Sequence, residues 1–170
     1  YQPKEYLYGT DERVKTQVEL TDYLHNEGAE KLECVTMIQC VGSRNQENPN
    51  CSRICCQSAV KNALALKEAN PDTQVFILYR DMRTYGLLED YYTQARKKGV
   101  IFVRFDKDHP PEVEATDEGL LVTVKDHVLQ QPIQIQSDLL ALSAGVAAAE
   151  TEDLSQIMKL NRNPEGFFLE

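Results

Sequence analysis

Short apolar runs that alternate with helix-like segments constrain the fold of this chain most strongly. Residues 34–39, 75–79 and 100–105 are apolar, rich in β-formers and too short for helices, so we expect buried strands there. The intervening segments 54–69 and 87–98 have helical patterns. This βαβαβ order predicts parallel strands joined by right-handed crossovers.

The pattern changes after Pro110-Pro111. Three segments then alternate apolar and polar residues, which predicts an antiparallel meander with one solvated face: 112–115, 119–125 and 132–136. Residues 138–145 form a last buried run that ends in small residues. The sequence therefore predicts an α/β fold: a Rossmann-like doubly wound parallel sheet with an antiparallel β-meander before the last parallel strand.

The expected organisation is one domain with flanking segments, because 170 residues rarely hold two complete domains. We expect an N-terminal connecting segment at 1–30, with a helix over 12–27, and a Rossmann-like domain at 31–150 with the meander at 110–137. A tail at 151–170 belongs either to this domain or to a neighbouring one. Its pattern predicts a helix at 152–159, a turn at 161–166 and a last strand at 167–169.

Four of the five cysteines lie close together, in the pattern C-x10-C-x3-C-C formed by Cys40, Cys51, Cys55 and Cys56. They fall between the predicted strand at 34–39 and the predicted helix at 54–69. In α/β folds this strand-to-helix turn is where ligands and cofactors bind. The fifth, Cys34, lies within the strand pattern and is expected to be a buried apolar residue.

The spacing leaves several chemistries open. Four thiolates can hold a [4Fe–4S] cluster or one Zn²⁺. Zinc is less suited, because its sites usually use two separated C-x2-C-like pairs, whereas this run has an adjacent pair and a C-x3-C step. A C-x3-C pair on one helical turn can also act as a redox dithiol, and the thiols can be merely structural. The pattern favours the cluster, and the alternatives stay open.

A nucleotide site of the usual kind is disfavoured at this turn. A dinucleotide fold would carry G-x-G-x-x-G there, but this chain has the single glycine Gly42. Arg80 and Arg83 follow the second predicted strand, where such folds place groups that bind a ribose or its phosphate. A loop of mutually paired charges explains them equally well. The three histidines are scattered and are expected on the surface: His25, His109 and His127.

The composition argues against some classes of binding partner. The formal net charge of −9 argues against a nucleic-acid surface, because phosphate contacts need clustered Lys and Arg. It gives no support for docking on anionic lipid, and no apolar run approaches the ~20 residues that span a bilayer. Cysteines bunched this tightly do not form a typical secreted disulfide framework, so we expect a reducing, cytoplasmic location. The start at Tyr1 rather than Met suggests a processed chain or an excised fragment.

Several motifs resemble the A subunit of heterodisulfide reductase, the iron–sulfur flavoprotein of methanogens and sulfate reducers. The most specific is Ile38-Gln39-Cys40-Val41-Gly42-Ser43-Arg44, followed by Cys51-Ser52-Arg53-Ile54-Cys55-Cys56. The likeness extends over nearly the whole chain, through Glu5–Gly9, Thr16-Gln17, Tyr79–Arg83, the strand at 138–145 and the ending Gly166-Phe167-Phe168.

This resemblance implies a thioredoxin-reductase-like core with an FAD domain and a second domain that is similar to an NADPH-binding one. Family members pass electrons among FAD, several [4Fe–4S] clusters and partner subunits of the B and C types. The resemblance implies that Cys40, Cys51, Cys55 and Cys56 ligate one cluster close to the flavin. It also implies that the following residues lie in the vicinity of FAD or a nucleotide: Thr16, Gln17, Gly42, Ser43, Arg44 and Gly145.

Two departures from the family pattern suggest the second domain of a longer polypeptide. The chain has neither an FAD-type glycine fingerprint nor a ferredoxin C-x2-C-x2-C-x3-C run. We therefore expect the fragment to be inactive alone and to self-associate through surface that an FAD domain would cover.

Three hypotheses follow. The first is an electron-transfer domain of an oxidoreductase like the heterodisulfide reductase A subunit, with a cluster that relays electrons to or from FAD in the intact polypeptide. The second is an NAD(P)H-binding domain of an FAD-dependent pyridine nucleotide-disulfide-type oxidoreductase that uses Arg80 and Arg83. The third is a non-catalytic subunit-interaction module.

Overall fold

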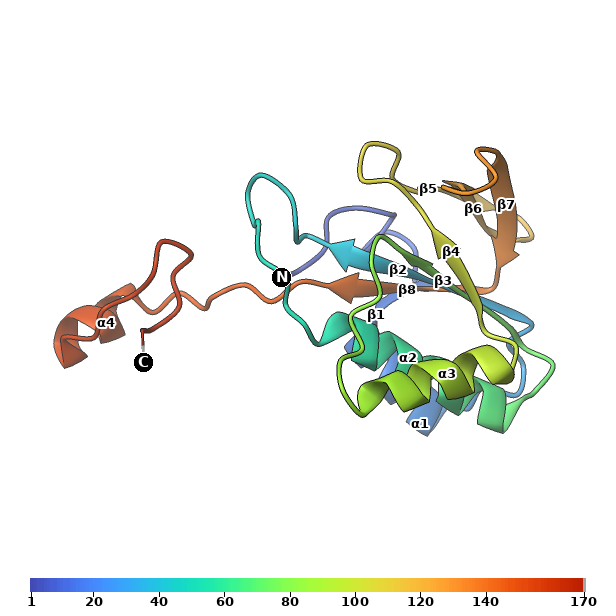
Figure 1. The fold of residues 1–170 in the computed structure, drawn as a ribbon, viewed down its shortest axis with the longest axis horizontal. Helices are drawn as coiled ribbons and strands as arrows, with labels where there is room; N and C mark the ends of the chain where they lie inside the picture. Colours follow the sequence, from blue (N-terminus) through green and yellow to red (C-terminus); the bar gives the residue numbers. More distant parts are fainter. Residues whose placement is uncertain (170) are drawn as a thin grey trace.

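A five-stranded parallel sheet forms the centre of the molecule (Figure 1). The computed structural model describes residues 1–169. In spatial order the strands are β1 (Val14–Thr16), β8 (Leu139–Ala144), β2 (Cys34–Val41), β3 (Gln74–Tyr79) and β4 (Ile101–Arg104). Every neighbouring pair in this sheet is parallel.

Helices cover one face of this sheet and a small antiparallel sheet covers the other (Figure 1). The helices are α1 (Gln17–Asn26), α2 (Cys55–Ala69) and α3 (Leu88–Lys97). The antiparallel sheet is the meander β5 (Glu112–Thr116), β6 (Gly119–Lys125) and β7 (Pro132–Ser137). The predicted α/β fold, with its meander before the last parallel strand, is confirmed.

Alternate residues of the two central strands fill two separate cores. Val35 and Met37 of β2 pack with α2 on the helical side, whereas Ile38 packs with residues of the meander. In β8, Ala141 faces the helices and Leu142 faces the meander. Both strands are buried on both faces, which explains their nearly continuous apolar sequences.

The strand order of the sheet reverses between β2 and β8, although all the strands stay parallel. From β2 it continues to β3 and β4 on one side, and β8 and β1 lie on the other side. Such a reversal opens a crevice at the carboxyl ends of the two strands, where α/β proteins bind ligands. The loop that carries the cysteines leaves β2 at this point.

The prediction for the N-terminal segment is wrong in part. The sequence predicted one helix over 12–27, but Val14–Thr16 form the edge strand β1, and the helix starts at Gln17. β1 exists because it pairs with β8, which is distant in sequence. Thr16 ends the strand and caps the helix: its hydroxyl accepts the N–H of Glu19, whose carboxylate accepts the N–H of Thr16.

The C-terminal segment stands away from the body of the molecule (Figure 1). It contains α4 (Glu152–Met158), close to the prediction, and no residue of this helix is buried. The strand predicted at 167–169 is absent from the described part of this segment, where only an isolated bridge joins Arg162 to Phe168. No strand of the central sheet pairs with these described residues.

None of the helices in residues 1–169 combines the length and the apolar character that crossing a membrane requires.

Asp138 closes the amino end of the sheet. Its Oδ2 accepts the N–H groups of Glu33 and Cys34 at 2.6 and 2.8 Å, and so joins the start of β2 to the start of β8. We predict that Asp138→Ala lowers the free energy of unfolding by about 2 kcal/mol, since two amides lose a charged acceptor. Urea denaturation followed by circular dichroism measures this, and Asp72→Ala, an exposed carboxylate on the β3 side, is the control. Equal stability of both variants would contradict the assigned role of Asp138.

Candidate functional site

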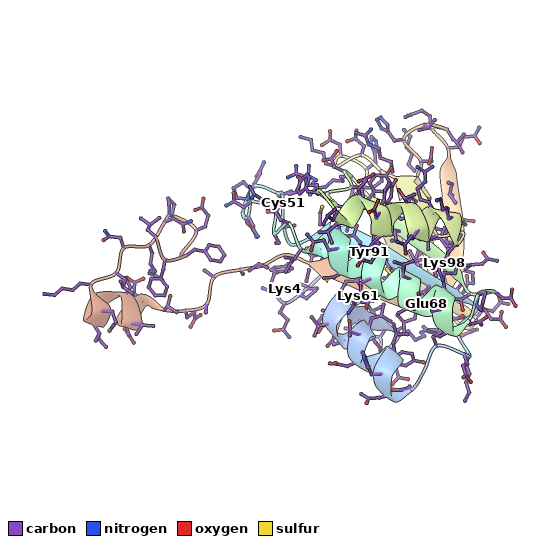
Figure 2. All side chains as sticks on the ribbon, turned by 60° about the horizontal axis from the view of Figure 1, so that its bottom comes forward. Lys4, Cys51, Lys61, Glu68, Tyr91 and Lys98 are labelled. Carbon is purple, nitrogen blue, oxygen red and sulfur yellow. The ribbon has the colours of Figure 1, made fainter. Side chains whose placement is uncertain are left out.

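A small cavity at the carboxyl edge of the sheet collects four of the five cysteines. Its lining includes the thiols expected from the sequence, together with polar residues of the same loop and of the loop after β3: Cys40, Ser43, Arg44, Cys51, Ser52, Arg53, Cys55, Cys56, Asp81 and Arg83. Figure 2 shows Cys51 on the loop that precedes α2, whereas Glu68 and Lys98 lie toward the other end of the helical layer. Cys34 is at the start of β2 and does not line the cavity.

The four thiols come from three neighbouring parts of the fold. Cys40 is near the end of β2, Cys51 is in the loop, and Cys55 and Cys56 begin α2. They surround the cavity rather than converge on one point. Among residues 1–169, no three His, Cys, Asp or Glu side chains are close enough together to hold a single metal ion.

Each thiol in the first turn of α2 lies against a main-chain carbonyl. Cys55 Sγ is 3.4 Å from the carbonyl oxygen of Ala144 at the end of β8, and Cys56 Sγ is 3.8 Å from that of Asp81 after β3. Burial, together with the neighbouring thiols Cys40 and Cys56, raises the pKa of Cys55 to about 11. Burial also raises the pKa of Cys56. These thiols keep their protons at neutral pH, and a metal or cluster would have to displace the protons in order to bind.

The backbone is strained in the cysteine loop, by which we mean residues 40–54, from the end of β2 to the start of α2. Cys40, Arg44 and Arg53 adopt φ angles of 65°, 58° and 62°, in the left-handed region that L-residues other than glycine rarely enter. Gly42, with φ of 64°, adopts the same region without this cost. Strain of this kind persists only where surrounding contacts fix the backbone, and it concentrates at functional sites.

Arg80 provides such contacts from the end of β3. Its two terminal nitrogens donate to the carbonyl oxygens of Ser43 and Arg44, each at 3.1 Å. Arg104 of β4 in turn donates to the carbonyl of Arg80 at 3.1 Å. The guanidinium that the sequence suggested for a nucleotide is therefore directed at the cysteine loop.

Arg44 connects this loop to the loop after β3. Its guanidinium donates to Asp81 Oδ2 at 2.6 Å and lies 3.8 Å from Cys40 Sγ. The hydrogen bond from Arg44 lowers the pKa of Asp81. A cation is thus held beside one of the four thiols, and the main-chain N–H of Arg53 lies 3.4 Å from another, Cys51 Sγ.

Gly145 lets β8 approach the cysteine loop closely. A Cβ atom added at Gly145 would lie 2.7 Å from Ser43 Cβ and 3.1 Å from the carbonyl oxygen of Gly42. Gly42 and Gly145, both expected near a cofactor, therefore meet at this edge. The Tyr1 ring also covers Gly42 and leaves no room for a Cβ atom there.

We predict that Gly145→Ala displaces the loop and lowers the free energy of unfolding by about 2 kcal/mol, because an extra methyl must fit against backbone. It should also reduce metal loading of the four thiols. Thermal denaturation and iron content after reconstitution measure both effects. Ala147→Ser, which adds one atom at an exposed position of the same segment, is the control. Unchanged stability and loading in Gly145→Ala would show that the close approach is not required.

Comparison with known proteins identifies related sequences. No family model matches the chain. It is 33% identical to the second iron-sulfur A subunit of the CoB–CoM heterodisulfide reductase of Methanopyrus kandleri over 98% of its own length, and 36% identical to the A subunit of the Methanocaldococcus jannaschii enzyme over 98%. The chain is homologous to a segment of the heterodisulfide reductase A subunit. It spans 28% of the length of both relatives.

Solved structures with the same fold come from other proteins of low sequence identity. L-lysine 6-monooxygenase from Pseudomonas syringae matches with a TM-score of 0.62 at 11% identity, over 98% of this chain and 48% of that one. Thioredoxin reductase from T. acidophilum matches with a TM-score of 0.59 at 12% identity, over 97% and 45%. The chain thus shares the fold of these two proteins.

Two further residues expected near a cofactor do not line the cysteine cavity. Thr16 uses its side chain to cap α1, and Gln17 is buried beside Asn62 of α2. The sequence also left the role of Asp81 unassigned. Its place after an apolar strand was a signal, since parallel strands end at the same edge of the sheet.

Proposed function

We propose that this segment is the electron-transfer domain of an oxidoreductase like the heterodisulfide reductase A subunit. Cys40, Cys51, Cys55 and Cys56 would hold a [4Fe–4S] cluster that relays electrons to or from FAD in the intact polypeptide. The observation that carries the proposal is the convergence of these four thiols on one cavity at the strand-reversal point of the sheet.

The donor set fits a cluster. A single Zn²⁺ is bonded directly to each thiolate sulfur at about 2.3 Å, so its ligands must converge on one point. A four-iron cluster places its own iron and sulfide atoms between the thiolates. Four thiols around a cavity suit the second case. When bound, the cluster would supply one-electron transfer.

The chain's own residues would position and tune this group. Arg44, held by Asp81, lies beside Cys40 Sγ, and the N–H of Arg53 lies beside Cys51 Sγ. Positive charge and hydrogen bonds at ligand sulfurs stabilise the more reduced state and so raise the reduction potential. Arg80 would hold the loop in the shape that brings Cys40 and Cys51 together.

The cofactors and partners proposed for the whole protein follow from the names of its relatives and from the family resemblance of its motifs. One relative is named an iron-sulfur A subunit of CoB–CoM heterodisulfide reductase, and one from Methanosarcina acetivorans is named the A subunit of a ferredoxin:CoB-CoM heterodisulfide reductase. We propose by analogy that this segment operates beside an FAD domain of the same polypeptide and with B- and C-type subunits.

The C-terminal tail, residues 151–170, is proposed to pack on that FAD domain. Among the described residues, its helix and ending expose apolar side chains: Leu154, Ile157, Met158, Phe167, Phe168 and Leu169. The relatives are more than three times as long as this chain, since it spans 28% of their length, so further polypeptide is available to cover them. Multi-angle light scattering should show self-association of residues 1–170 that is lost after truncation at residue 150. A monomer at all concentrations would contradict the proposed exposure.

NAD(P)H binding is the second candidate, because the fold matches thioredoxin reductase. The single glycine after β2 and the engagement of Arg80 with loop carbonyls oppose it. Titration calorimetry with NADPH should detect no heat of binding, and micromolar affinity would favour this candidate instead.

Anaerobic reconstitution with iron and sulfide tests the main proposal. We expect about four irons per chain, broad absorbance in the visible range, and an EPR signal after reduction. Failure to incorporate iron while the protein remains folded by circular dichroism would overturn it.

A further inference from the structure

Buried polar atoms without partners concentrate at one edge of the molecule. Among residues 1–169, the buried side-chain nitrogen and oxygen atoms that make no hydrogen bond are Gln17 Nε2, Gln39 Nε2 and Oε1, Arg80 Nε and Ser143 Oγ. All four residues lie at the carboxyl ends of parallel strands or directly after them. Buried polar groups are nearly always paired, so such a concentration needs an explanation.

Three of the four residues form a row across neighbouring strands. Thr16 of β1 and Ile38 of β2 both lie beside Leu142 of β8. The next residue along each chain belongs to the row: Gln17, Gln39 and Ser143. Past Ile38 the pairing of β2 with β8 becomes irregular, and it resumes at Val41 and Ala144. Their exposed fractions are 6%, 2% and 1%, so bulk solvent does not reach them.

The row faces the helical layer. Met37 and Ala141 pack in the core under α2, and side chains two residues apart on a strand share a face. Ser143 therefore faces the helical layer, and Gln39, which follows the meander-facing Ile38, begins the irregular stretch of β2 on that same side. The residue after Ser143 is Ala144, whose carbonyl oxygen lies 3.4 Å from Cys55 Sγ.

Asn62 of α2 holds Gln17, the third member of the row, through two hydrogen bonds. Its Nδ2 donates to the main-chain oxygen and to Oε1 of Gln17 at 2.9 and 2.8 Å. This leaves Gln17 Nε2 as a donor. Gln39 offers a donor and an acceptor, and the hydroxyl of Ser143 can do either. Water is the ligand that satisfies such a mixed set, since a buried water makes two to four hydrogen bonds to polar groups.

We propose that Gln17, Gln39 and Ser143 form a buried water-binding site directly behind the cysteine cavity. The bound water would also affect the cluster, and this part of the inference rests on the proposed function. The water dipoles lie near Cys55 and Cys56 and can reorient toward a more negative cluster, so the site raises the reduction potential of the cluster.

Two variants of the row and one control test the proposal. Gln39→Leu keeps the volume but removes two polar atoms, and Ser143→Ala removes the hydroxyl. Thr73→Val is the control, because it removes a buried hydroxyl that already donates to the Leu32 carbonyl at 2.7 Å, before the start of β3. A high-resolution crystal structure of the anaerobically purified chain locates the water, and an EPR-monitored redox titration measures the potential of the reconstituted chain.

We expect ordered water within hydrogen-bond distance of at least two of the three side chains in the wild type. That water should disappear in Gln39→Leu, and both row variants should have a more negative midpoint potential than Thr73→Val, which should match the wild type. Wild-type density without water, or variant potentials equal to that of the control, would overturn the inference. Neither result affects the proposed function, which fails only if the wild-type chain takes up no cluster; the water can be sought in the metal-free protein as well.

Discussion

Cys51→Ser is expected to lose the reconstituted cluster, with a fall of about tenfold or more in cluster affinity. Cys51 is the one thiol of the four that lies on the loop between β2 and α2, outside both elements. It is only partly buried, so serine should leave the fold intact. Iron and sulfide content, visible absorbance and EPR together measure the loss.

Cys34→Ser provides a matched control for this variant. Cys34 is also partly buried, but it lies at the start of β2, where its Sγ is 3.8 Å from Ser137 Oγ. The control should bind as much iron as the wild type. If Cys51→Ser and Cys34→Ser load equally, the fourth ligand of the cluster is not Cys51 and the assigned set is wrong.

Arg80→Met is expected to have the second large effect, on both stability and loading. The substitution leaves the carbonyls of Ser43 and Arg44 without their charged donor, each bond being 3.1 Å in the wild type. Hydrogen bonds from charged groups contribute about 1.5–3 kcal/mol each, so we expect the free energy of unfolding to fall by about 3 kcal/mol. The loop should then relax from its left-handed conformations and load less cluster.

Two further variants separate the charge of Arg80 from its geometry. Arg80→Lys keeps the charge but cannot reach two carbonyls with a planar fork, so it should recover stability only in part. Arg83→Met removes a cation from the cavity lining, to which Arg80 does not contribute, and leaves those two bonds in place, so it should load normally. Normal loading in Arg80→Met would show that the loop holds its shape without this side chain. A loss in Arg83→Met equal to that in Arg80→Met would indicate a general charge effect.

The sequence correctly predicted those features that depend only on residues close together in the chain. The meander follows from alternation within each strand, and the cysteine cavity follows from spacing within one loop and the turn of helix after it. β1 could not be recognised, because three residues carry too little periodicity and the strand depends on its pairing with β8. The role of Arg80 was also hidden, since its partners Ser43 and Arg44 come from another strand-to-helix loop. The domain boundaries and the cofactor-binding residues stay predictions.

The lengths of the outermost strands bear on how copies of this segment can meet. The sheet ends at β1 and β4, which have only three and four residues. Such short borders offer few main-chain groups to an incoming strand, and so protect the sheet from strand addition by another chain. Association of the isolated segment should therefore proceed through side chains of the projecting tail and leave the β-sheet content unchanged.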